Sequence, residues 1–454
     1  MSKQLIFDVL NHKETERSAW VPFAGIHAGV LKGYTAKELL TDEAKLFESL
    51  LEVNKIYSPD GMPVLFDLQV EAEILGCDLK WYEDTPPTVC SHPLAENMQV
   101  PCECLLPKGD EGRLPMIIRT MEKVKAEIGA DTALYGLVCG PFTLASHLRG
   151  TEIFMDMYDD EDFVCDLVEF CGKFIIEVSK MYIKAGMDVI AVVDPLVSQI
   201  SDEHFSDFLS KTYTKVFEEI RNAGAYSSFF VCGDATRNIE EMCKTNPDAI
   251  SVDENVKLDK AKEITDKFNI VIEGNIPLTT IMLHGTQQDN MKYVVDLIAS
   301  LPNNNKNLII SPGCDMPYAI PVENTIGAGQ AVIEYEKTAE MVKNYTSADA
   351  FADIEVEIAD YANLEKPFVE VFTLDSTSCA ACTYMMAVAN DLKAIMGDKI
   401  DVIEYKFTEK ASIARCMKMG VKQLPSLYIN GELAYSSIIP SVEKLVEQVT
   451  SLLK

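Results

Sequence analysis

Residues 133–141 of this chain read ALYGLVCGP, an apolar run that stops at a glycine–proline pair. A continuous apolar run of this length is typical of a strand buried on both faces, and Gly140-Pro141 ends it. Helical patterns, such as those at 163–185 and 204–223, lie between further runs of this kind. Continuous apolar strands that alternate with helices predict a parallel sheet with βαβ crossovers. The other expected strands are residues 188–193, 228–231, 249–252, 270–273 and 307–310.

The number of these units favours a closed (β/α)8 (TIM) barrel, with a doubly wound open sheet as the alternative. Six of the expected strands end in small or polar residues. In such a barrel the carboxyl ends of the strands build the active site, so the sequence predicts a site there. The six strand ends are Cys139-Gly140-Pro141, Asp194-Pro195, Cys232-Gly233-Asp234, Asp253-Glu254, Glu273-Gly274-Asn275 and Ser311-Pro312-Gly313-Cys314.

The composition excludes several classes of function. The chain has 454 residues and a formal net charge of −31, which repels nucleic acid and anionic membranes. The N-terminus lacks the long apolar segment of a signal peptide, and no apolar run is long enough for a membrane helix. The 13 cysteines are scattered through apolar segments, unlike the disulfide framework of a short secreted chain. We therefore expect a cytoplasmic protein of more than one domain, most of whose cysteines are reduced.

The chain divides into a large and a small domain. Residues 346–366 are acidic and lack an apolar stripe, which predicts a linker between a barrel of residues 1–345 and a domain of residues 367–454. After the linker, strands are expected at 369–374 and 402–405, helices at 384–395, 413–419 and 442–453, and a hairpin around Asn430-Gly431. The small domain is therefore also α/β.

Cys379 and Cys382 form a C-x-x-C pair between the first strand and the first helix of the small domain. A helix N-terminus stabilises a thiolate, so Cys379 should be the nucleophile and Cys382 the resolving cysteine. Half of a zinc site and a fold with idle cysteines are the alternatives. The order of elements and the segment GVKQLPSL at 420–427 resemble thioredoxin. The resemblance implies a thiol–disulfide module with a cis peptide bond before Pro425.

Several segments of the large domain resemble the uroporphyrinogen decarboxylase superfamily. They occur in the family's order over nearly all of residues 1–340. The resemblance implies a (β/α)8 barrel, which agrees with the pattern of strands. The matching segments are EAEILGC at 71–77, GLVCGPFTLAS at 136–146, Asp194-Pro195, Cys232-Gly233-Asp234 and SPGCDMP at 311–317.

The superfamily contains two kinds of chemistry. Its decarboxylases bind the carboxylates of their substrate with an arginine-rich segment near the N-terminus. The matching residues 23–29, FAGIHAG, contain no arginine, so porphyrinogen decarboxylation is not expected. The other branch holds corrinoid-dependent methyltransferases, such as methylcobamide:coenzyme M methyltransferases. Their zinc holds the acceptor thiol as a thiolate, which attacks the methyl group on cobalt.

The resemblance implies a zinc site with an altered ligand set. The methyltransferases ligate zinc through a H-x-C … C set, and Cys232 and Cys314 stand at the two cysteine positions. Phe230 stands at the histidine position, and two thiolates alone do not complete a tetrahedral site. Asp253-Glu254 or Glu273 could supply a carboxylate, as a glutamate does in the related cobalamin-independent methionine synthase. Alternatively, the metal has been lost and the cysteines serve another purpose.

The remaining candidates are expected to bind substrate. Asp67 matches the pyrrole-binding aspartate position of the decarboxylases, and His147 replaces the family's tyrosine after L-A-S. Asp194, Glu273 and Asn275 stand at strand ends and are expected to line the pocket.

Together these features predict a methyltransferase that moves a methyl group from a methylated corrinoid protein to a small thiol or a reduced pterin. The thioredoxin-like module would keep the barrel cysteines reduced or act on a disulfide form of the acceptor. Two alternatives stay open. One is a thiol–disulfide protein whose barrel only binds a partner or tetrapyrrole, and the other is a decarboxylase-like lyase with an altered substrate.

Overall fold

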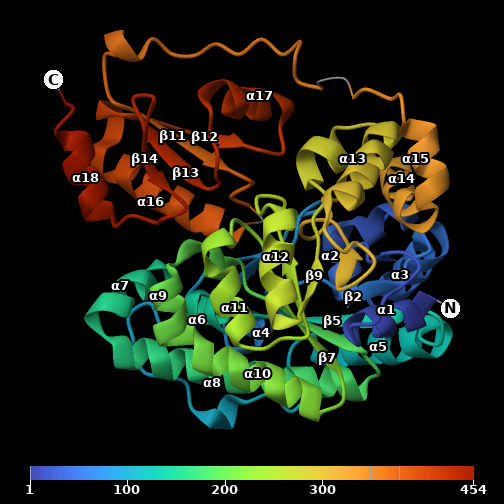
Figure 1. Ribbon diagram of the computed structural model, residues 1–454. Coiled ribbons are helices and arrows are strands. Elements are labelled where there is room, and N and C mark those ends of the chain that lie inside the picture. Colours follow the sequence, from blue (N-terminus) through green and yellow to red (C-terminus); the bar gives the residue numbers. More distant parts are fainter. Residues whose placement is uncertain (1, 348–349, 378, 454) are drawn as a thin grey trace. The chain divides into compact units, whose positions relative to one another are not determined.

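The computed structural model describes residues 2–347, 350–377 and 379–453. The chain forms two compact units, Met1–Ser347 and Ala348–Lys454 (Figure 1). None of the helices within the described residues combines the length and apolar character needed to cross a membrane.

The first unit is an eight-stranded parallel barrel, as predicted. Its strands follow one another in the order β1-β10-β9-β8-β7-β6-β5-β2. The Asp60 amide donates to the Trp20 carbonyl at 2.9 Å and closes the ring between β1 and β2, which rules out the open sheet. The strands are β1 (Ala19–Trp20), β2 (Gly61–Leu65), β5 (Ala133–Cys139), β6 (Val189–Val193), β7 (Tyr226–Val231), β8 (Ala249–Val252), β9 (Val271–Glu273) and β10 (Leu308–Ile310).

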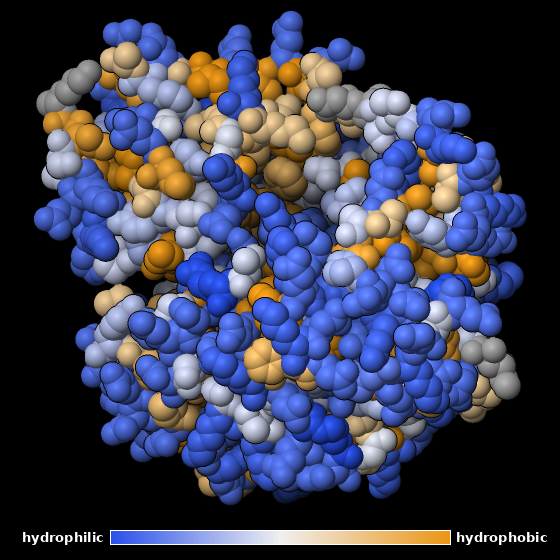
Figure 2. All heavy atoms as spheres, viewed as in Figure 1, coloured by the Kyte–Doolittle hydropathy of each residue, from blue (hydrophilic) through white to orange (hydrophobic). Residues whose placement is uncertain are grey.

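Amphipathic helices cover the outside of the barrel. The long α8 (Glu161–Lys184) and α10 (Ser210–Asn222) pack side by side along its lower edge in Figure 1. The outer faces of these helices are mainly hydrophilic on the side seen in Figure 2, as the charge of the chain leads us to expect. The other principal helices are α1 (Ser2–Leu10), α2 (Ala36–Thr41), α3 (Glu43–Tyr57), α4 (Val70–Ile74), α5 (Leu114–Ile128), α6 (Pro141–Arg149), α7 (Ile153–Asp159), α9 (Asp202–His204), α11 (Ile239–Lys244), α12 (Leu258–Phe268), α13 (Gln287–Ser300), α14 (Val322–Ile333) and α15 (Tyr335–Val342).

The inside of the barrel is filled by alternate residues of its strands, since side chains alternate between the two faces of a strand. Tyr135 of β5 and Ala191 of β6 belong to this buried cluster. At the carboxyl ends of the strands the cluster is aromatic. Phe23, Phe66 and Phe230 have ring centroids between 4.9 and 6.2 Å apart. These rings form an apolar floor under the predicted site.

The second unit is a four-stranded mixed sheet with helices, as the thioredoxin resemblance predicts. β11 pairs in parallel with β12 and antiparallel with β13, and β13 pairs antiparallel with β14, so β12 and β14 are the two edge strands. The Leu424–Pro425 bond is cis, in agreement with the sequence prediction. The elements are β11 (Phe368–Thr373), α16 (Ala380–Met396), β12 (Asp401–Lys406), α17 (Lys410–Met419), β13 (Ser426–Ile429), β14 (Glu432–Ser436) and α18 (Val442–Thr450).

Most of the segment expected to be a linker packs on this second unit. Phe351 is buried against Ile413 of α17. Arg415 donates to the carbonyl of Glu357 at 2.6 Å, and Lys418 donates to that of Val356 at 2.7 Å. The acidic composition of the segment concealed the apolar residues that make these contacts, so its middle is not a free chain.

Candidate active site at the mouth of the barrel

Cys232 and Cys314 meet over the carboxyl end of the barrel. Cys232 follows β7 and Cys314 follows β10, and these strands are separated in the sheet by β8 and β9. Their loops nevertheless bring the two Cα atoms to 5.9 Å, and the two sulfurs form a disulfide. Both residues are half-buried and pack against the barrel core. The structure thus unites the two predicted metal ligands, but in an oxidised form.

Glu254 lies next to this pair. A side chain on Gly313 would collide with Glu254 Oε2, so the glycine before Cys314 lets the carboxyl group approach closely. Glu254 Oε1 accepts a hydrogen bond from the Leu278 amide at 3.3 Å, whereas the buried Oε2 has no partner among the described residues. Burial, and secondarily the charge of Asp253, raises the pKa of Glu254 well above its ordinary value. Glu254 therefore presents an unpartnered polar atom beside the disulfide.

Asp253 and Asn275 are occupied in holding the loops around Glu254. Asp253 accepts hydrogen bonds from Asn255 and from the backbone of Gly233, which follows Cys232. The Asn275 amide donates to the carbonyls of Asp253 at 2.9 Å and Val256 at 2.7 Å. These contacts support the site from outside and leave neither side chain obviously directed at a substrate.

The predicted zinc does not fit the site in this oxidation state. A disulfide offers no thiolate, which is the form of cysteine that binds metals. Phe230, at the position of the missing histidine, is fully buried in the aromatic floor. With Cys232 and Cys314 joined in a disulfide, no three His, Cys, Asp or Glu side chains among the described residues are grouped so that they could hold a metal ion.

Glu273 is buried inside the barrel. Its Oε2 accepts from the Ser251 hydroxyl at 2.6 Å, and Ser251 lies 3.0 Å from the Ser228 hydroxyl. Its Oε1 finds no hydrogen-bond partner in the part of the chain that the structure describes. Burial raises the pKa of Glu273 to about 7, so the group exchanges a proton near neutral pH.

Asp194 has a role that the sequence did not predict. It is completely buried and accepts hydrogen bonds from the Phe142 amide and from the amide and hydroxyl of Thr143, at the start of α6. The Tyr213 hydroxyl donates to the same carboxyl group. These contacts fix the start of α6 to the end of β6 through Asp194.

Asp67 is likewise held by a protein group. It accepts from Arg113 Nη1 at 2.6 Å, while Arg113 Nε donates to Glu73 at 2.7 Å. The side chain of Arg113 is 11% exposed, and its Nη2 lacks a partner among the described residues. Glu71, on α4, accepts from the Cys139 amide at 3.3 Å, and burial raises its pKa to about 8. At neutral pH Glu71 is therefore a largely protonated acid at the barrel mouth.

His147 is buried in the last turn of α6. Burial lowers its pKa to about 3, so its ring is neutral, and neither ring nitrogen has a partner within the described chain. Its backbone carbonyl accepts from Cys77 Sγ at 3.4 Å and lies 2.8 Å from His92 Nδ1. The ring is thus a neutral polar group available to a ligand that reaches it.

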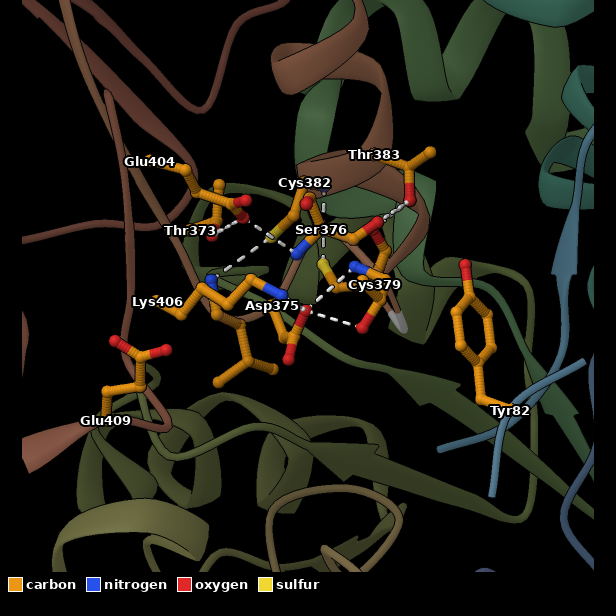
Figure 3. A network of polar contacts seen from close by, with 12 residues as sticks. Tyr82, Thr373, Asp375, Ser376, Cys379, Cys382, Thr383, Glu404, Lys406 and Glu409 are labelled. Carbon is orange, nitrogen blue, oxygen red and sulfur yellow. Dashed lines mark hydrogen bonds and ion pairs between the residues drawn. The ribbon is translucent and has the colours of Figure 1, made fainter. Parts of the chain in front are cut away.

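The two module cysteines have the unequal environments that the sequence predicts for a nucleophile and a resolving thiol. Cys379 caps α16, where its sulfur accepts from the Cys382 amide at 3.4 Å (Figure 3). It is half-buried, whereas Cys382 is 1% exposed and accepts from the Leu374 amide at 3.3 Å. Burial raises the pKa of the Cys382 thiol well above its ordinary value. Nearby, Lys406 pairs with Asp375 at 2.8 Å.

Sequence reasoning missed Arg113, Glu71 and Asp315 as parts of the site. Asp315 accepts from the Gly25 amide at 2.9 Å and ties the loop after β1 to that after β10, and burial raises its pKa well above the ordinary value. Glu71 and Asp315 lie inside the two segments EAEILGC and SPGCDMP, where a charged residue among apolar ones was a usable signal. Arg113 stands in a polar loop, and nothing in the sequence marked it as the partner of Asp67.

Comparisons with known proteins agree with this architecture. Residues 1–335 match the uroporphyrinogen decarboxylase (URO-D) family, and residues 369–450 match a thioredoxin domain. The chain belongs to the uroporphyrinogen decarboxylase family and carries a thioredoxin domain at its C-terminal side.

Within the family, the expected resemblance to the corrinoid-dependent methyltransferases is confirmed. The chain is 27% identical over 292 residues to a methylcobamide:CoM methyltransferase of Methanosarcina acetivorans, covering 63% of this chain and 80% of that protein. It is 23% identical over 291 residues to the uroporphyrinogen decarboxylase of Wolbachia pipientis wMel, covering 62% and 80%. A solved methyltransferase from Methanosarcina mazei shares the fold, with a TM-score of 0.67 and 20% identity over 74% of this chain and 99% of that one.

Proposed function

We propose that this protein is a methyltransferase that takes a methyl group from a corrinoid carried by a partner protein and delivers it to the sulfur of a small thiol. The observation that carries this proposal is the similarity to methylcobamide:CoM methyltransferases across 292 residues, 63% of this chain. A reduced pterin is the alternative acceptor. The similarity to thiol methyltransferases favours the thiol, as does the similarity to a methylated-thiol–coenzyme M methyltransferase of Methanosarcina mazei.

The mouth of the barrel disfavours the decarboxylase alternative. Residues 23–29 contain no arginine, and Phe23, Ile26 and His27 are buried side chains, so no carboxylate clamp forms there. Arg113 already pairs with Asp67 and Glu73.

In the proposed reaction, different side chains accept the proton, bind the acceptor and position the loops. The acceptor sulfur must lose its proton, attack the methyl carbon and form a carbon–sulfur bond, while the electron pair of the cobalt–carbon bond stays with the corrinoid. Glu273 Oε1 has no partner among the described residues, and Glu273, whose pKa is about 7, is the group available to receive that proton. Asp67 and His147 form the walls against which the acceptor binds, and Asn275, Asp253 and Asp194 hold the surrounding loops.

Metal chemistry at this site depends on reduction. Reduction of the disulfide would free Cys232 and Cys314 as thiolates beside Glu254, and three protein ligands with an open fourth position are the usual composition of a catalytic zinc site. Bound zinc would lower the pKa of an acceptor thiol and hold it as the thiolate.

The proposal is tested with methylcobalamin as methyl donor and 2-mercaptoethanesulfonate as acceptor, using reduced full-length protein without oxygen. We expect loss of methylcobalamin together with an equal amount of S-methylated thiol. Glu127→Gln, which changes an exposed residue of α5, is the control for altered charge. Absence of the methylated product with this thiol, with other small thiols and with a reduced pterin would refute a methyltransferase.

A further inference from the structure

Thirteen cysteines yield a single disulfide in the described part of the chain, and it lies in the candidate site. Cys232 and Cys314 are bonded, whereas the other eleven cysteines are free. The free ones include Cys90, Cys102 and Cys104, which are exposed. Cys232 and Cys314 therefore differ from the other cysteines in their oxidation state.

The disulfide is placed where another thiol can attack it. Both of its residues are half-buried rather than enclosed, and they rest on top of the aromatic floor. A structural disulfide inside a core is inaccessible to thiols, whereas accessible disulfides are the labile ones.

The same chain holds a reduced dithiol suited to this attack. Cys379 and Cys382 are both free thiols. The sulfur of Cys379 accepts a hydrogen bond from the Cys382 amide at the N-terminus of α16, and Cys379 is the more exposed of the two cysteines. Cys382 is buried next to Cys379 and accepts a hydrogen bond from the Leu374 amide, so it can attack a mixed disulfide formed at Cys379. One oxidised pair and one reduced pair are the two reactants of a thiol–disulfide exchange.

The attachment of the module favours a reaction within one chain. The Tyr345 hydroxyl donates to Asp289 at 3.1 Å in the first turn of α13. Helices of a (β/α)8 barrel begin at the end where the strands finish, so the chain leaves the barrel at the end that carries the disulfide. Phe351, six residues later, is already packed on the second unit. A tether this short spans at most about 20 Å and gives effective concentrations on the order of millimolar.

We infer that the Cys232–Cys314 disulfide is the substrate of the chain's own dithiol module, so that the protein is a thiol–disulfide oxidoreductase acting on its own active site. The Cys379 thiol loses its proton, and its sulfur attacks one sulfur of the pair. The Cys232–Cys314 bond breaks, a mixed disulfide forms, and the other barrel sulfur leaves as a thiolate that takes a proton. The Cys382 thiol then loses its proton, and its sulfur attacks the Cys379 sulfur. The mixed-disulfide bond breaks, and the second barrel sulfur leaves as a thiolate that takes a proton.

The products are a Cys379–Cys382 disulfide and two barrel thiols. Two electrons move from the module to the barrel, and an external dithiol reductant must reduce the module for the next cycle. The inference deepens the proposed function and rests on it, because the two barrel cysteines that the exchange releases are the ones that would hold the zinc for the acceptor thiol. The exchange itself needs neither corrinoid nor acceptor, so it can be tested apart from methyl transfer.

The test uses the full chain with Cys382→Ser, which removes the resolving thiol and should trap the mixed disulfide. The protein is first oxidised at Cys232–Cys314 and then kept without reductant, and its disulfides are mapped by mass spectrometry. We expect Cys379 joined to Cys232 or Cys314, in a fraction that a tenfold dilution leaves unchanged. Cys382→Ala also lacks the resolving thiol and should trap the same adduct. The double substitution Cys379→Ser/Cys382→Ser, which cannot form the adduct, is the control.

A kinetic measurement on the unaltered chain completes the test. With a limiting dithiol reductant, loss of the Cys232–Cys314 bond should be at least about tenfold faster than in Cys379→Ser. The inference is overturned if Cys379 links only to other cysteines, if the adduct forms only between molecules, or if the two rates are equal. None of these results would decide whether the protein transfers methyl groups, because that assay uses protein that has been reduced chemically.

Discussion

Replacing Glu71 with glutamine should make the barrel more stable, and the gain should grow with pH. Glu71 is 1% exposed, and burial raises its pKa to about 8 from an ordinary value of 4.5. The folded protein therefore holds this proton at pH values where the unfolded chain has lost it. Since stability falls with rising pH wherever the native state binds more protons, Glu71 costs stability between about pH 4.5 and 8.

The magnitude follows from the two pKa values. At pH 5 the raised pKa of Glu71 lowers the free energy of unfolding by about 1 kcal/mol, and at pH 8 it lowers it by about 4 kcal/mol. The advantage of Glu71→Gln over the unaltered protein should thus increase by about 3 kcal/mol across this range. The amide keeps the shape of the side chain, and its oxygen can still accept from the Cys139 amide.

The measurement is denaturant unfolding followed by tryptophan fluorescence at several pH values. The chain has 2 tryptophans, Trp20 and Trp81, and both belong to the barrel unit, so the signal reports on that unit alone. Glu127→Gln, at an exposed position of the same unit, corrects for the loss of one charge. A stability difference that stays constant from pH 5 to pH 8 would show that Glu71 is not a buried, protonated acid.

Three further predictions concern the cysteines and the substrate. Alkylation of the reduced protein at mildly acidic pH should label Cys379 well before the buried Cys382, and equal labelling would contradict their assigned roles. Metal analysis after anaerobic purification with zinc should find about one equivalent in reduced protein and none in oxidised protein or in Cys232→Ser; equal zinc in all three would place the metal elsewhere. Uroporphyrinogen should not be decarboxylated at an enzymatic rate, because residues 23–29 lack the arginine clamp, and turnover would reopen the decarboxylase alternative.

Much of the architecture was predictable because it rests on local patterns. The strand 133–138 and the break at Gly140-Pro141 gave the βα unit, and its repetition led to the barrel. The cis bond before Pro425 followed from the resemblance to thioredoxin. The packed segment around Phe351 was not predictable, because its contacts depend on Ile413 and Arg415, which lie some 60 residues further along the chain.

The candidate site was predictable in its position and less so in its chemistry. Strand ends pointed to Cys232, Cys314 and Glu254, and the structure brings these residues together. The oxidation state of the two cysteines could not be read from the sequence, since it depends on how two loops from non-adjacent strands approach each other. For the same reason Asp194 looked like a pocket residue until its donors were known.

The dependence of methyl transfer on the state of Cys232 and Cys314 tests this account most directly. Transfer from methylcobalamin to a small thiol is measured with one preparation of the full chain, first oxidised, then reduced, and then reoxidised. A Cys232→Ser variant is treated in the same way. We predict activity only in the reduced, unaltered protein, with loss on reoxidation and recovery on renewed reduction. Equal activity in the oxidised protein, or full activity in Cys232→Ser, would show that methyl transfer does not use this pair.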